Sequence, residues 1–382
     1  MTKLEQLIQE LCPNGVKYLK IGEVVNYEQP SKYIVSSTDY NDAFDIPVLT
    51  AGQTFILGYT NEKNGIYYAS KEEPVIIFDD FTGAFKWVDF PFKVKSSAMK
   101  ILTVEDKRTF LRYIFHVMGY IGYSSTEHKR LWIGLYSEIE IPVPPLPVQS
   151  EIVRILDTFT ELTTELTTEL TTRKQQYEHY TYQLLNFDDT VQTHQLRELI
   201  DFRNGKGHEK DIVSDGKYIV VNSKFISTNG EVKKYSNKQI CPLFVDDILM
   251  VMSDLPNGRA LAKCFLVAED DKYTLNQRIG AFHVKDESVI KTKFLLYVLN
   301  RNQQLLKYDN GVDQTNLRKD DILDIMIPIP SIEEQERIVA ILDRFDTLCN
   351  DISEGLPAEI EGRRKQYEYY RDKLLTFKEL GV

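Results

Sequence analysis

An internal duplication constrains the fold of this chain more than any other feature of its sequence. Ile141–Phe159 reads IPVPPLPVQSEIVRILDTF and Ile327–Phe345 reads IPIPSIEEQERIVAILDRF, with ten of 19 positions identical. A second pair of segments, Arg173–Phe187 and Arg363–Phe377, is identical at eight of 15 positions. Because sequence repeats indicate a structural unit that is used more than once, we predict two copies of one unit, each a domain followed by a helix.

Each repeat is predicted to begin with a proline-interrupted strand and to continue as a long helix. In the first copy, apolar residues recur at spacings of three, four or seven between Ile152 and Leu184, which is typical of a helix that buries one face. A helix from Glu151 to Phe187 extends for ~55 Å. The second copy has the same stripe with one additional four-residue step. Two such helices most simply pack against each other, and we expect them to be antiparallel.

Three shorter segments modify this plan. The repeat TELTTELTTEL (Thr160–Leu170) is interpreted as a spacer without chemistry, held helical by packing of its leucines because threonine is a mediocre helix former. Gly355–Leu356–Pro357 in the second helix predicts a kink or break. The first eleven residues, MTKLEQLIQEL, read as an amphipathic helix without the apolar core of a signal peptide. We expect this helix to pack near the carboxy-terminal end of the second long helix.

The two domains are rich in short β-type runs separated by turns. Hairpins are predicted at Thr82–Gly83 and Asn229–Gly230, and each domain closes with a helix, Phe110–Met118 or Phe294–Arg301. The predicted class is α+β: two mixed-sheet domains separated by two long helices that pack as an antiparallel coiled coil with a pseudo-twofold internal repeat. The expected boundaries are 1–12 for the amino-terminal helix, 13–146 for the first domain, 147–187 for the first long helix, 188–330 for the second domain, and 331–382 for the second long helix and tail.

Composition indicates a globular chain whose acidity lies mostly outside the domains. The formal charge is −11, of which −7 lies on the two long helices, whereas the domains are close to neutral. Local basic loops can therefore still bind phosphate. The sequence has no run of ~18 apolar residues, so it predicts no membrane span. The four cysteines are scattered without a CxxC pair, which fits a reducing cytoplasm.

Recognisable catalytic motifs are missing from the sequence. There is no GxxxxGK[ST], GxSxG or HExxH motif, and no glycine-rich strand–turn–helix for a dinucleotide or methyl donor. His116 lies in an apolar helical run and is interpreted as packing. The pairs Asp79–Asp80 and Asp246–Asp247 are interpreted as turn residues at strand ends, because neighbours on a strand point to opposite faces. We therefore expect no catalytic residue, no metal and no cofactor.

After these exclusions, the remaining candidates for a functional site are loops whose side chains could bind phosphates and base edges. RNGKGHEK (Arg203–Lys210) combines a flexible backbone with cations, and amide and guanidinium side chains read adenine and guanine in the major groove. The alternative for each residue is an ordinary position on a solvated surface. The candidate DNA-binding residues are Lys32, Tyr33, Gln53, Tyr59, Thr60, Asn61, Lys86, Ser96 and Ser97 in the first domain, and Arg203, Lys206, His208, Lys210, Lys233, Lys234, Asn257, Arg259, Asn276 and Arg278 in the second.

The paired IPxPxxxxQxxIVxILDxF segments, the TTEL tetrapeptides and the paired QYExYxxxLLxF ends resemble the specificity subunits of type I DNA restriction–modification systems. The resemblance covers nearly the whole chain. It implies that each domain is a target recognition domain reading one half of a bipartite double-stranded DNA sequence. It also implies that the long helices are a ruler and a docking surface for two methyltransferase subunits. Adenine methylation, translocation and cleavage then belong to other chains, the methyltransferase and restriction subunits.

Four tyrosines on the long helices are candidates for binding the methyltransferase: Tyr177, Tyr180, Tyr367 and Tyr370. The alternative is that they only pack the helix pair. For the whole chain, the alternative function is a coiled-coil scaffold with two protein-binding domains and no role on DNA. Binding to DNA, with and without the methyltransferase, distinguishes these two functions.

Overall fold

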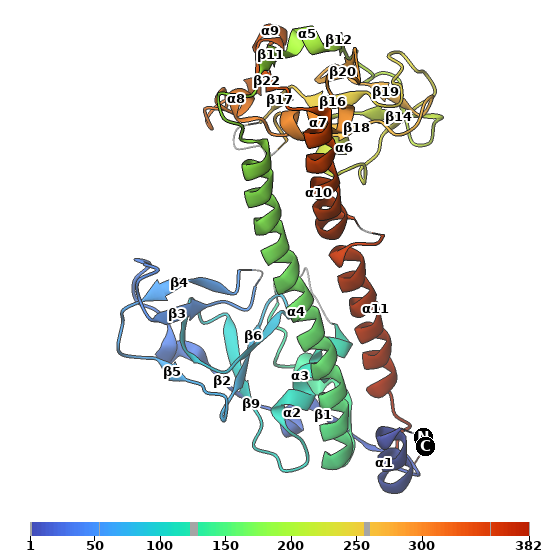
Figure 1. Cartoon of the computed structure of the whole chain (residues 1–382). Coiled ribbons are helices and arrows are strands. Elements are labelled where there is room, and N and C mark those ends of the chain that lie inside the picture. The colour runs from blue at the N-terminus through green and yellow to red at the C-terminus, as the bar shows by residue number, and fades with distance from the viewer. Residues whose placement is uncertain (1, 53, 123–128, 256–259, 352, 382) are drawn as a thin grey trace. The chain divides into compact units, whose positions relative to one another are not determined.

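The computed structural model describes residues 2–52, 54–122, 129–255, 260–351 and 353–381. The chain divides into two compact units (Figure 1). Unit 1 contains Met1–Thr168 together with Ala358–Val382, and unit 2 contains Glu169–Pro357. Unit 1 is therefore built from both ends of the chain, so that the second repeat supplies a helix to the unit that holds the first domain.

Unit 1 contains two four-stranded sheets. The first is antiparallel throughout and has the order β2 (Asn26–Glu28), β9 (Met99–Thr103), β6 (Val75–Asp79), β7 (Phe85–Val88). The second has the order β4 (Ile56–Thr60), β3 (Ile46–Leu49), β8 (Pro91–Val94), β5 (Tyr67–Tyr68), and its central pair β3–β8 is parallel. The predicted hairpin at Thr82–Gly83 is confirmed, because β6 and β7 pair across it and Gly83 has φ 76°.

Unit 2 repeats this topology apart from the position of one outer strand in its second sheet. Its antiparallel sheet has the order β12 (Ile200–Asn204), β20 (Ile279–Val284), β16 (Ile248–Val251), β18 (Cys264–Leu266). The other sheet has the order β13 (Ile212–Val213), β15 (Tyr235–Ser236), β14 (Tyr218–Val221), β19 (Tyr273–Leu275), and its parallel pair, β14–β19, lies at one edge. The predicted duplication and the α+β class are confirmed, and the duplication extends into domains whose sequences barely match.

Short elements complete the two units. In unit 1 these are α1 (Lys3–Leu11), α2 (Ile21–Val24), η1 (Pro30–Tyr33), α3 (Leu111–Ile121) and η2 (Tyr136–Glu138). In unit 2 they are α5 (Leu196–Leu199), α6 (Ser223–Ser227), β17 (Ser253–Asp254), α7 (Thr292–Leu299), α8 (Gln303–Leu306), β21 (Thr315–Asn316) and α9 (Lys319–Leu323). The helices predicted to close the two domains are confirmed as α3 and α7.

The proline-interrupted strands are also confirmed. In unit 1, β10 (Glu140–Val143) pairs with β1 (Lys17–Lys20), and in unit 2, β22 (Met326–Pro328) pairs with β11 (Thr193–Gln195). Both pairs are antiparallel and two-stranded. Each pair joins the start of a domain to the segment that leads into the long helix.

The long helices differ in continuity. The first, α4, runs unbroken from Leu146 to Leu185, 40 residues. The second is divided into α10 (Ile332–Asn350) and α11 (Leu356–Leu374), so the predicted break at Gly355–Leu356–Pro357 is confirmed. Within the tetrapeptides of α4 the threonine hydroxyls donate to carbonyls four residues earlier, as Thr164 does to Thr160 at 2.8 Å. Leu162 is 38% exposed, so leucine packing is a weaker support for this stretch than predicted.

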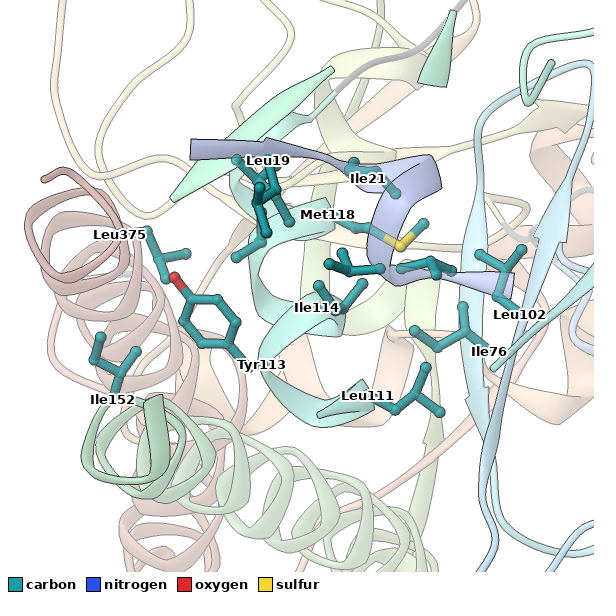
Figure 2. Packing of buried hydrophobic residues seen from close by; sticks show 14 of the residues in the cluster. Leu19, Ile21, Ile76, Leu102, Leu111, Tyr113, Ile114, Met118, Ile152 and Leu375 are labelled. Atoms are coloured by element: carbon teal, nitrogen blue, oxygen red, sulfur yellow. The ribbon is translucent and has the colours of Figure 1, made fainter. Parts of the chain in front are cut away.

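The helices pair through aromatic and aliphatic side chains within each unit. In unit 1, Phe159 of α4 stacks on Tyr370 of α11 with ring centroids 5.3 Å apart, and Ile152 shares a core with Leu375 (Figure 2). In unit 2, Tyr180 of α4 stacks on Phe345 of α10 at 5.6 Å. Phe159 follows Ile152 along the chain, whereas its partner Tyr370 precedes Leu375. The pairing in unit 1 is therefore antiparallel, as predicted.

The cores of the two units lie between the sheets and the long helices. Figure 2 shows Tyr113 of α3 with Ile152 and Leu375 on one side and Ile76 and Leu102 of the antiparallel sheet on the other. The Tyr113 hydroxyl donates to the Pro142 carbonyl at 2.9 Å. The core of unit 2 likewise joins the antiparallel sheet and α7 to α10, with Tyr177 and Leu184 of α4 packed against it.

One buried glutamine fixes the start of the long helix in each unit. The amide of Gln149 donates to the carbonyls of Arg108 (2.8 Å) and Pro144 (2.7 Å), and its oxygen accepts from the Thr109 hydroxyl. Gln335, at the same position of the second repeat, donates to Val289 and Pro330 and accepts from the Lys291 N–H. Both side chains are fully buried. This shared residue therefore ties each helix to the domain that precedes it.

The amino-terminal helix packs where it was predicted to pack. Leu4 is buried in the same core as Leu375, and the Tyr18 hydroxyl donates to the Phe377 carbonyl at 3.0 Å. Lys3 forms an ion pair with Glu151 at 3.0 Å. Hydrogen bonds from Arg154 and Lys3 lower the pKa of Glu151 to about 2.

The prediction of a hairpin at Asn229–Gly230 is wrong. The preceding residues form α6, and the Gly230 N–H donates to the Phe225 carbonyl at 2.8 Å. Asn229 and Gly230 do have positive φ, 49° and 86°, but they close a helical turn instead of joining two strands. Left-handed residues also terminate helices, so the dipeptide alone did not distinguish the two structures.

The interpretation of the paired aspartates as turn residues is only half correct. Asp79 is a turn residue, since its carboxylate accepts from the N–H groups of Phe81 and Thr82 at 2.9 Å. Asp80 is instead buried and forms an ion pair with buried Lys100 at 3.2 Å. In unit 2, Asp246 has a positive φ of 67°, whereas Asp247 is fully buried. The second carboxylate of each pair faces the interior because neighbours on a strand point to opposite faces.

We expect Gln335→Leu to lower the free energy of unfolding by about 1–3 kcal/mol, because it removes the partner of the Val289 and Pro330 carbonyls and of the Lys291 N–H. Urea unfolding followed by circular dichroism measures the change. Gln175→Leu, on the exposed face of α4, is the matched control and should change stability little. Equal stability of the two variants would contradict the assigned role of Gln335.

Candidate nucleic-acid interface

The structure brings together two of the segments that sequence analysis selected in the second domain. The loop after β12 lies against the turn after β19, because Lys206 N–H donates to the Leu275 carbonyl and Gly205 N–H to the Ile279 carbonyl, both at 3.1 Å. A Cβ atom on Gly205 would overlap the carbonyl oxygen of Asn276. Only glycine therefore permits this approach, and it places residues 203–210 beside residues 276–278.

Three exposed cations project from this pair of segments: Lys206, Lys210 and Arg278. None of the three forms an ion pair with any carboxylate in the part of the chain that the structure describes. The nearby carboxylate of Glu209 accepts a hydrogen bond from the Gln277 amide at 3.0 Å. Asn276 is half-buried, and its side-chain oxygen accepts from the Gln277 N–H.

Two other candidates in the same loop are tied to the interior. The Arg203 guanidinium forms an ion pair with Asp247, donates to the Pro242 carbonyl at 2.9 Å and lies 5.2 Å from the centre of the Phe244 ring. His208 is fully buried between the Lys206 carbonyl (2.7 Å) and the Thr274 hydroxyl (2.9 Å). Their side chains hold the loop in its conformation, and the cations around them extend outward.

Unit 1 places candidates at the equivalent positions of its own fold. Lys32 and Tyr33 lie in η1, directly after β2, which corresponds to β12. Ser96 and Ser97 follow β8, which corresponds to β19, and both serines are exposed. The Lys95 N–H donates to the last carbonyl of β3, just as the Asn276 N–H donates to the last carbonyl of β14. The first residues after the parallel pair of strands therefore emerge in the same way in both units.

Tyr33 is held in place by its neighbours. Its hydroxyl donates to Glu28 at 3.2 Å, and its ring meets the Tyr67 ring edge to face, with centroids 5.0 Å apart. Burial, together with the Glu28 charge, raises the pKa of Tyr33. The Lys32 ammonium is exposed and lies 3.4 Å from Glu28, an exposed pair that contributes little to stability.

The remaining candidates are dispersed. Tyr59 is half-buried in β4, Thr60 is buried with its hydroxyl accepting from the Glu62 N–H, and Asn61 is exposed. Lys86 is half-buried in β7, in the other sheet of unit 1. Lys233 and Lys234 are exposed just before β15. Gln53, Asn257 and Arg259 lie outside the described residues.

Sequence analysis missed one segment that adjoins the loops of unit 2. The Leu317 N–H donates to the Met252 carbonyl at 2.8 Å, and the Met252 N–H donates to the Arg278 carbonyl at 3.0 Å. The Lys319 ammonium lies 5.4 Å from the centre of the Phe202 ring, next to Arg203. The run QTNLRK (Gln314–Lys319) has the mixture of amides and cations that selected Arg203–Lys210, so composition alone was a sufficient signal.

The four candidate tyrosines on the long helices each contact the opposite helix or the adjoining core. Tyr177 and Tyr180 stack on Phe345, and Tyr370 stacks on Phe159. Tyr367 packs against the core of unit 1, with its hydroxyl 3.5 Å from His116. His116 is buried and bonded to Asp157 at 2.8 Å, as expected of a packed histidine. Tyr180 and Tyr370 remain 44% and 40% exposed.

Two further observations concern chemistry and membranes. Over the described ranges, no group of three or more His, Cys, Asp or Glu side chains is placed to hold a metal ion. No helix among the residues that the structure describes is both long and apolar enough to cross a bilayer.

This arrangement of two domains with long helices is the fold of a known class of restriction–modification subunits. The structure is similar to that of the S subunit of a type I restriction–modification system from M. genitalium, with a TM-score of 0.59 and 14% identity, covering 94% of this chain and 96% of that one. A chain from a structure of the type I R-M system matches with a TM-score of 0.55 and 15% identity over 95% and 98% of the two chains.

Sequence comparison shows the family. The profile described as "Type I restriction modification DNA specificity domain" matches residues 13–173 and again 188–362. The EcoR124I/EcoR124II specificity subunit of the type I restriction enzyme of Escherichia coli is 41% identical, over 99% of this chain and 97% of its own length. The chain therefore belongs to the family of type I restriction–modification specificity subunits.

Replacing Lys206, Lys210 and Arg278 together by alanine should weaken binding to duplex DNA and flatten its salt dependence. Each phosphate contact that is lost lowers the slope of log K against log salt by about 0.9. Fluorescence anisotropy over a range of NaCl concentrations measures the slope. The control replaces Arg337, Arg364 and Lys365, three exposed cations that already pair with glutamates. An unchanged slope in the first variant would remove these loops from the interface.

Proposed function

We propose that this chain is the non-catalytic DNA-recognition subunit of a type I restriction–modification enzyme, reading a bipartite double-stranded target with one domain on each half. The observation that carries the proposal is the equivalent presentation of loops by two copies of one fold. Each copy exposes the residues that follow the same two strands, β2 and β8 in unit 1 and β12 and β19 in unit 2. Two similar readers in one chain suit a target with two separated halves.

Within each domain we propose a division between backbone contacts and base contacts. Lys206, Lys210 and Arg278 in unit 2, and Lys32 in unit 1, are assigned to phosphates, because exposed ammonium and guanidinium groups are the usual phosphate partners. Asn276 in unit 2, and Asn61, Ser96 and Ser97 in unit 1, are assigned to base edges, where amides and hydroxyls exchange hydrogen bonds.

We add the segment Gln314–Lys319 to the proposed surface of unit 2. Arg318 is exposed, and Gln314 donates to the Ser253 hydroxyl at 2.8 Å, which orders the segment beside the turn at Arg278. Counted back twelve and eleven residues without a gap from Ile141 and Ile327, Lys129 and Arg130 of unit 1 take the places of Thr315 and Asn316. Both units therefore carry polar or basic residues at this second position.

The partners that we propose are two methyltransferase subunits, together with restriction subunits that translocate and cleave DNA. Methyl transfer to adenine and cleavage are assigned to those chains, and the cytoplasm is assigned as the compartment. The exposed sides of the helix tyrosines are candidate docking surfaces, one in each unit, extended by Tyr182 in unit 2 and Tyr369 in unit 1, which are more exposed than Tyr180 and Tyr370. Tyrosine provides large contact area at low entropic cost, as is common at the centre of interfaces.

Exchange of one domain tests the proposed function directly. Residues 13–146 are replaced by the corresponding residues of a relative with a different target, and the hybrid is expressed with the methyltransferase. We expect methylated adenines in the host genome to change in only one half of the recognised sequence, because each domain reads its own half. Single-molecule sequencing of the genome measures this. If the unmodified chain does not bind DNA even together with its methyltransferase, the result would instead support a protein-binding scaffold.

Replacing Tyr180 and Tyr370 by alanine should weaken binding of the methyltransferase at least about tenfold if their exposed faces contact it. Phenylalanine at both positions keeps the stacks on Phe345 and Phe159 and is the matched control. Affinity is measured by isothermal titration, and helix pairing by thermal melting. A lower melting temperature with unchanged affinity would show that these tyrosines only pack the helices.

A further inference from the structure

The two domains each place a buried polar residue at the same point of the same strand. In unit 1, Lys93 of β8 lies opposite Val48 of β3, one residue before this parallel pair ends. In unit 2, Thr274 of β19 lies opposite Val220 of β14, again one residue before the pair ends. Lys93 is only 2% exposed and Thr274 is fully buried. We call these two side chains the anchor residues, because loops of the proposed DNA surface are bonded to them.

In unit 1 the buried ammonium of Lys93 holds the turn that follows β4. It forms an ion pair with Glu62 at 2.9 Å and donates to the Asn64 carbonyl at 2.6 Å. Gly65 continues the turn with φ 64°. A Cβ atom on Gly65 would overlap the Lys32 carbonyl oxygen and would lie 3.2 Å from the Lys93 ammonium. The turn therefore closes tightly over the ammonium and packs against the loop that carries Lys32.

Glu62 connects this ammonium to a second loop. Its other carboxylate oxygen accepts from the N–H groups of Ser36 (2.8 Å) and Ser37 (3.0 Å). Burial opposes ionisation of Glu62, but hydrogen bonds from Lys93 and from the two serine N–H groups outweigh it and lower the pKa of the carboxyl. The carboxylate is therefore charged at neutral pH, as a buried lysine requires of its partner. One ion pair thus fastens two loops of the proposed DNA surface to β8.

In unit 2 the Thr274 hydroxyl makes the corresponding connections. It lies 2.9 Å from Nε2 of buried His208 and accepts from the Cys241 N–H at 3.1 Å. Because a carbonyl can only accept, Nδ1 of His208 donates to the Lys206 carbonyl at 2.7 Å. Nε2 of the neutral ring is then an acceptor, and the Thr274 hydroxyl donates to it. One hydroxyl thus fastens the loop at His208 and the segment at Cys241 to β19.

The loop that follows the first strand of each domain also bonds to the residue after the anchor. The Val35 N–H donates to the Val94 carbonyl at 2.9 Å in unit 1, and the Lys206 N–H donates to the Leu275 carbonyl at 3.1 Å in unit 2. In both units a residue two positions further along the loop connects to the anchor residue, through Glu62 in unit 1 and directly in unit 2. The same connection built from different side chains favours a requirement of the fold over an accident of one copy.

We infer that the anchor residue of each domain, Lys93 or Thr274, is a positioning residue that sets how strictly the domain reads its half of the target. The inference rests on the proposed function and extends it from exposed residues to buried ones. Hydrogen bonds to base edges are directional, so a loop that shifts loses discrimination between bases. A lysine on a flexible stem can still reach a phosphate after a small shift. Loss of an anchor should therefore lower specificity more than affinity.

Thr274→Val and Thr274→Ser are a closely matched pair of variants. Valine keeps the volume of threonine but removes the partner of the His208 ring and of the Cys241 N–H, whereas serine keeps the hydroxyl. Each variant is assembled with its methyltransferase, and Kd is measured by fluorescence anisotropy for the duplex target found by methylation mapping and for duplexes with one substituted base pair in either half. With Thr274→Val, we expect the preference for the target over mismatches in one half to fall at least about fivefold. The preference in the other half should not change, and Thr274→Ser should behave like the parent chain.

Lys93→Met tests the anchor of unit 1, and the loss of preference is expected in the opposite half of the target. Methionine removes the cation and leaves the Glu62 carboxylate without it. Adding Glu62→Gln removes this charge and keeps an oxygen for the Ser36 and Ser37 N–H groups. The double variant should therefore recover at least about half of the lost preference on a logarithmic scale. A lysine that only fills space would give no such recovery.

Lys20→Met is the control for unit 1, because Lys20 forms an exposed ion pair with Glu138 at 2.6 Å. It should leave the preferences in both halves unchanged. Unchanged preferences with Thr274→Val, or equal losses in both halves with any variant, would overturn the inference, because an anchor acts within one domain. If Lys93→Met does not fold, the two Thr274 variants decide the outcome alone. A parent complex that prefers no duplex sequence would instead overturn the proposed function itself.

Discussion

Each long helix has an apolar face that its own repeat does not cover. In unit 1, Ile152 and Leu156 at the start of α4 are buried with Leu375 from the end of the chain, and in unit 2, Ile338 of α10 lies in a core that Tyr177 and Leu184 of α4 complete. Burial of apolar surface at roughly 25 cal/mol per Å² therefore depends on both repeats being present. The attachment of each domain depends on this requirement, because a domain can be fixed only to a helix that is itself packed against a partner.

The attachment of domain to helix is polar, in contrast to the apolar pairing of the helices. Gln149 and Gln335 each bond two carbonyls and one donor in a fully buried site. Asp157 and Asp343, eight residues later, accept from side chains of α3 and α7: Asp157 from Arg112 and His116, and Asp343 from Lys293 and Tyr297. Directional bonds of this kind fix an orientation that apolar contact alone leaves free. The glutamine and the aspartate are both among the positions identical in the two repeats.

Residues that obey a long-range period were predictable, and residues whose conformation depends on one local contact were not. The stripe from Ile152 to Leu184 spans about nine turns, so its helix was evident, as was the break just before Leu356–Pro357. Asn229–Gly230 carries the dihedral angles expected of a hairpin but closes α6, since the deciding contact is the bond from Gly230 to Phe225. Only two residues separate β7 from β8, yet these strands belong to different sheets. The sheet assignment depends on pairing with β3, which is distant in sequence.

The candidate interface could likewise be predicted from the sequence only in part. Composition located the loop Arg203–Lys210, but it did not distinguish cations that hold the loop from cations that are free to bind. Arg203 resembles Lys206 in charge, and the two are distinguished by the buried carboxylate of Asp247, which lies just before β16 and more than 40 residues later in sequence. A guanidinium committed to a buried partner is costly to withdraw, so Arg203 is suited to positioning. The exposed neighbours Lys206, Lys210 and Arg278 have no such partner among the described residues, which is why we propose them, and not Arg203, as the groups that bind phosphate.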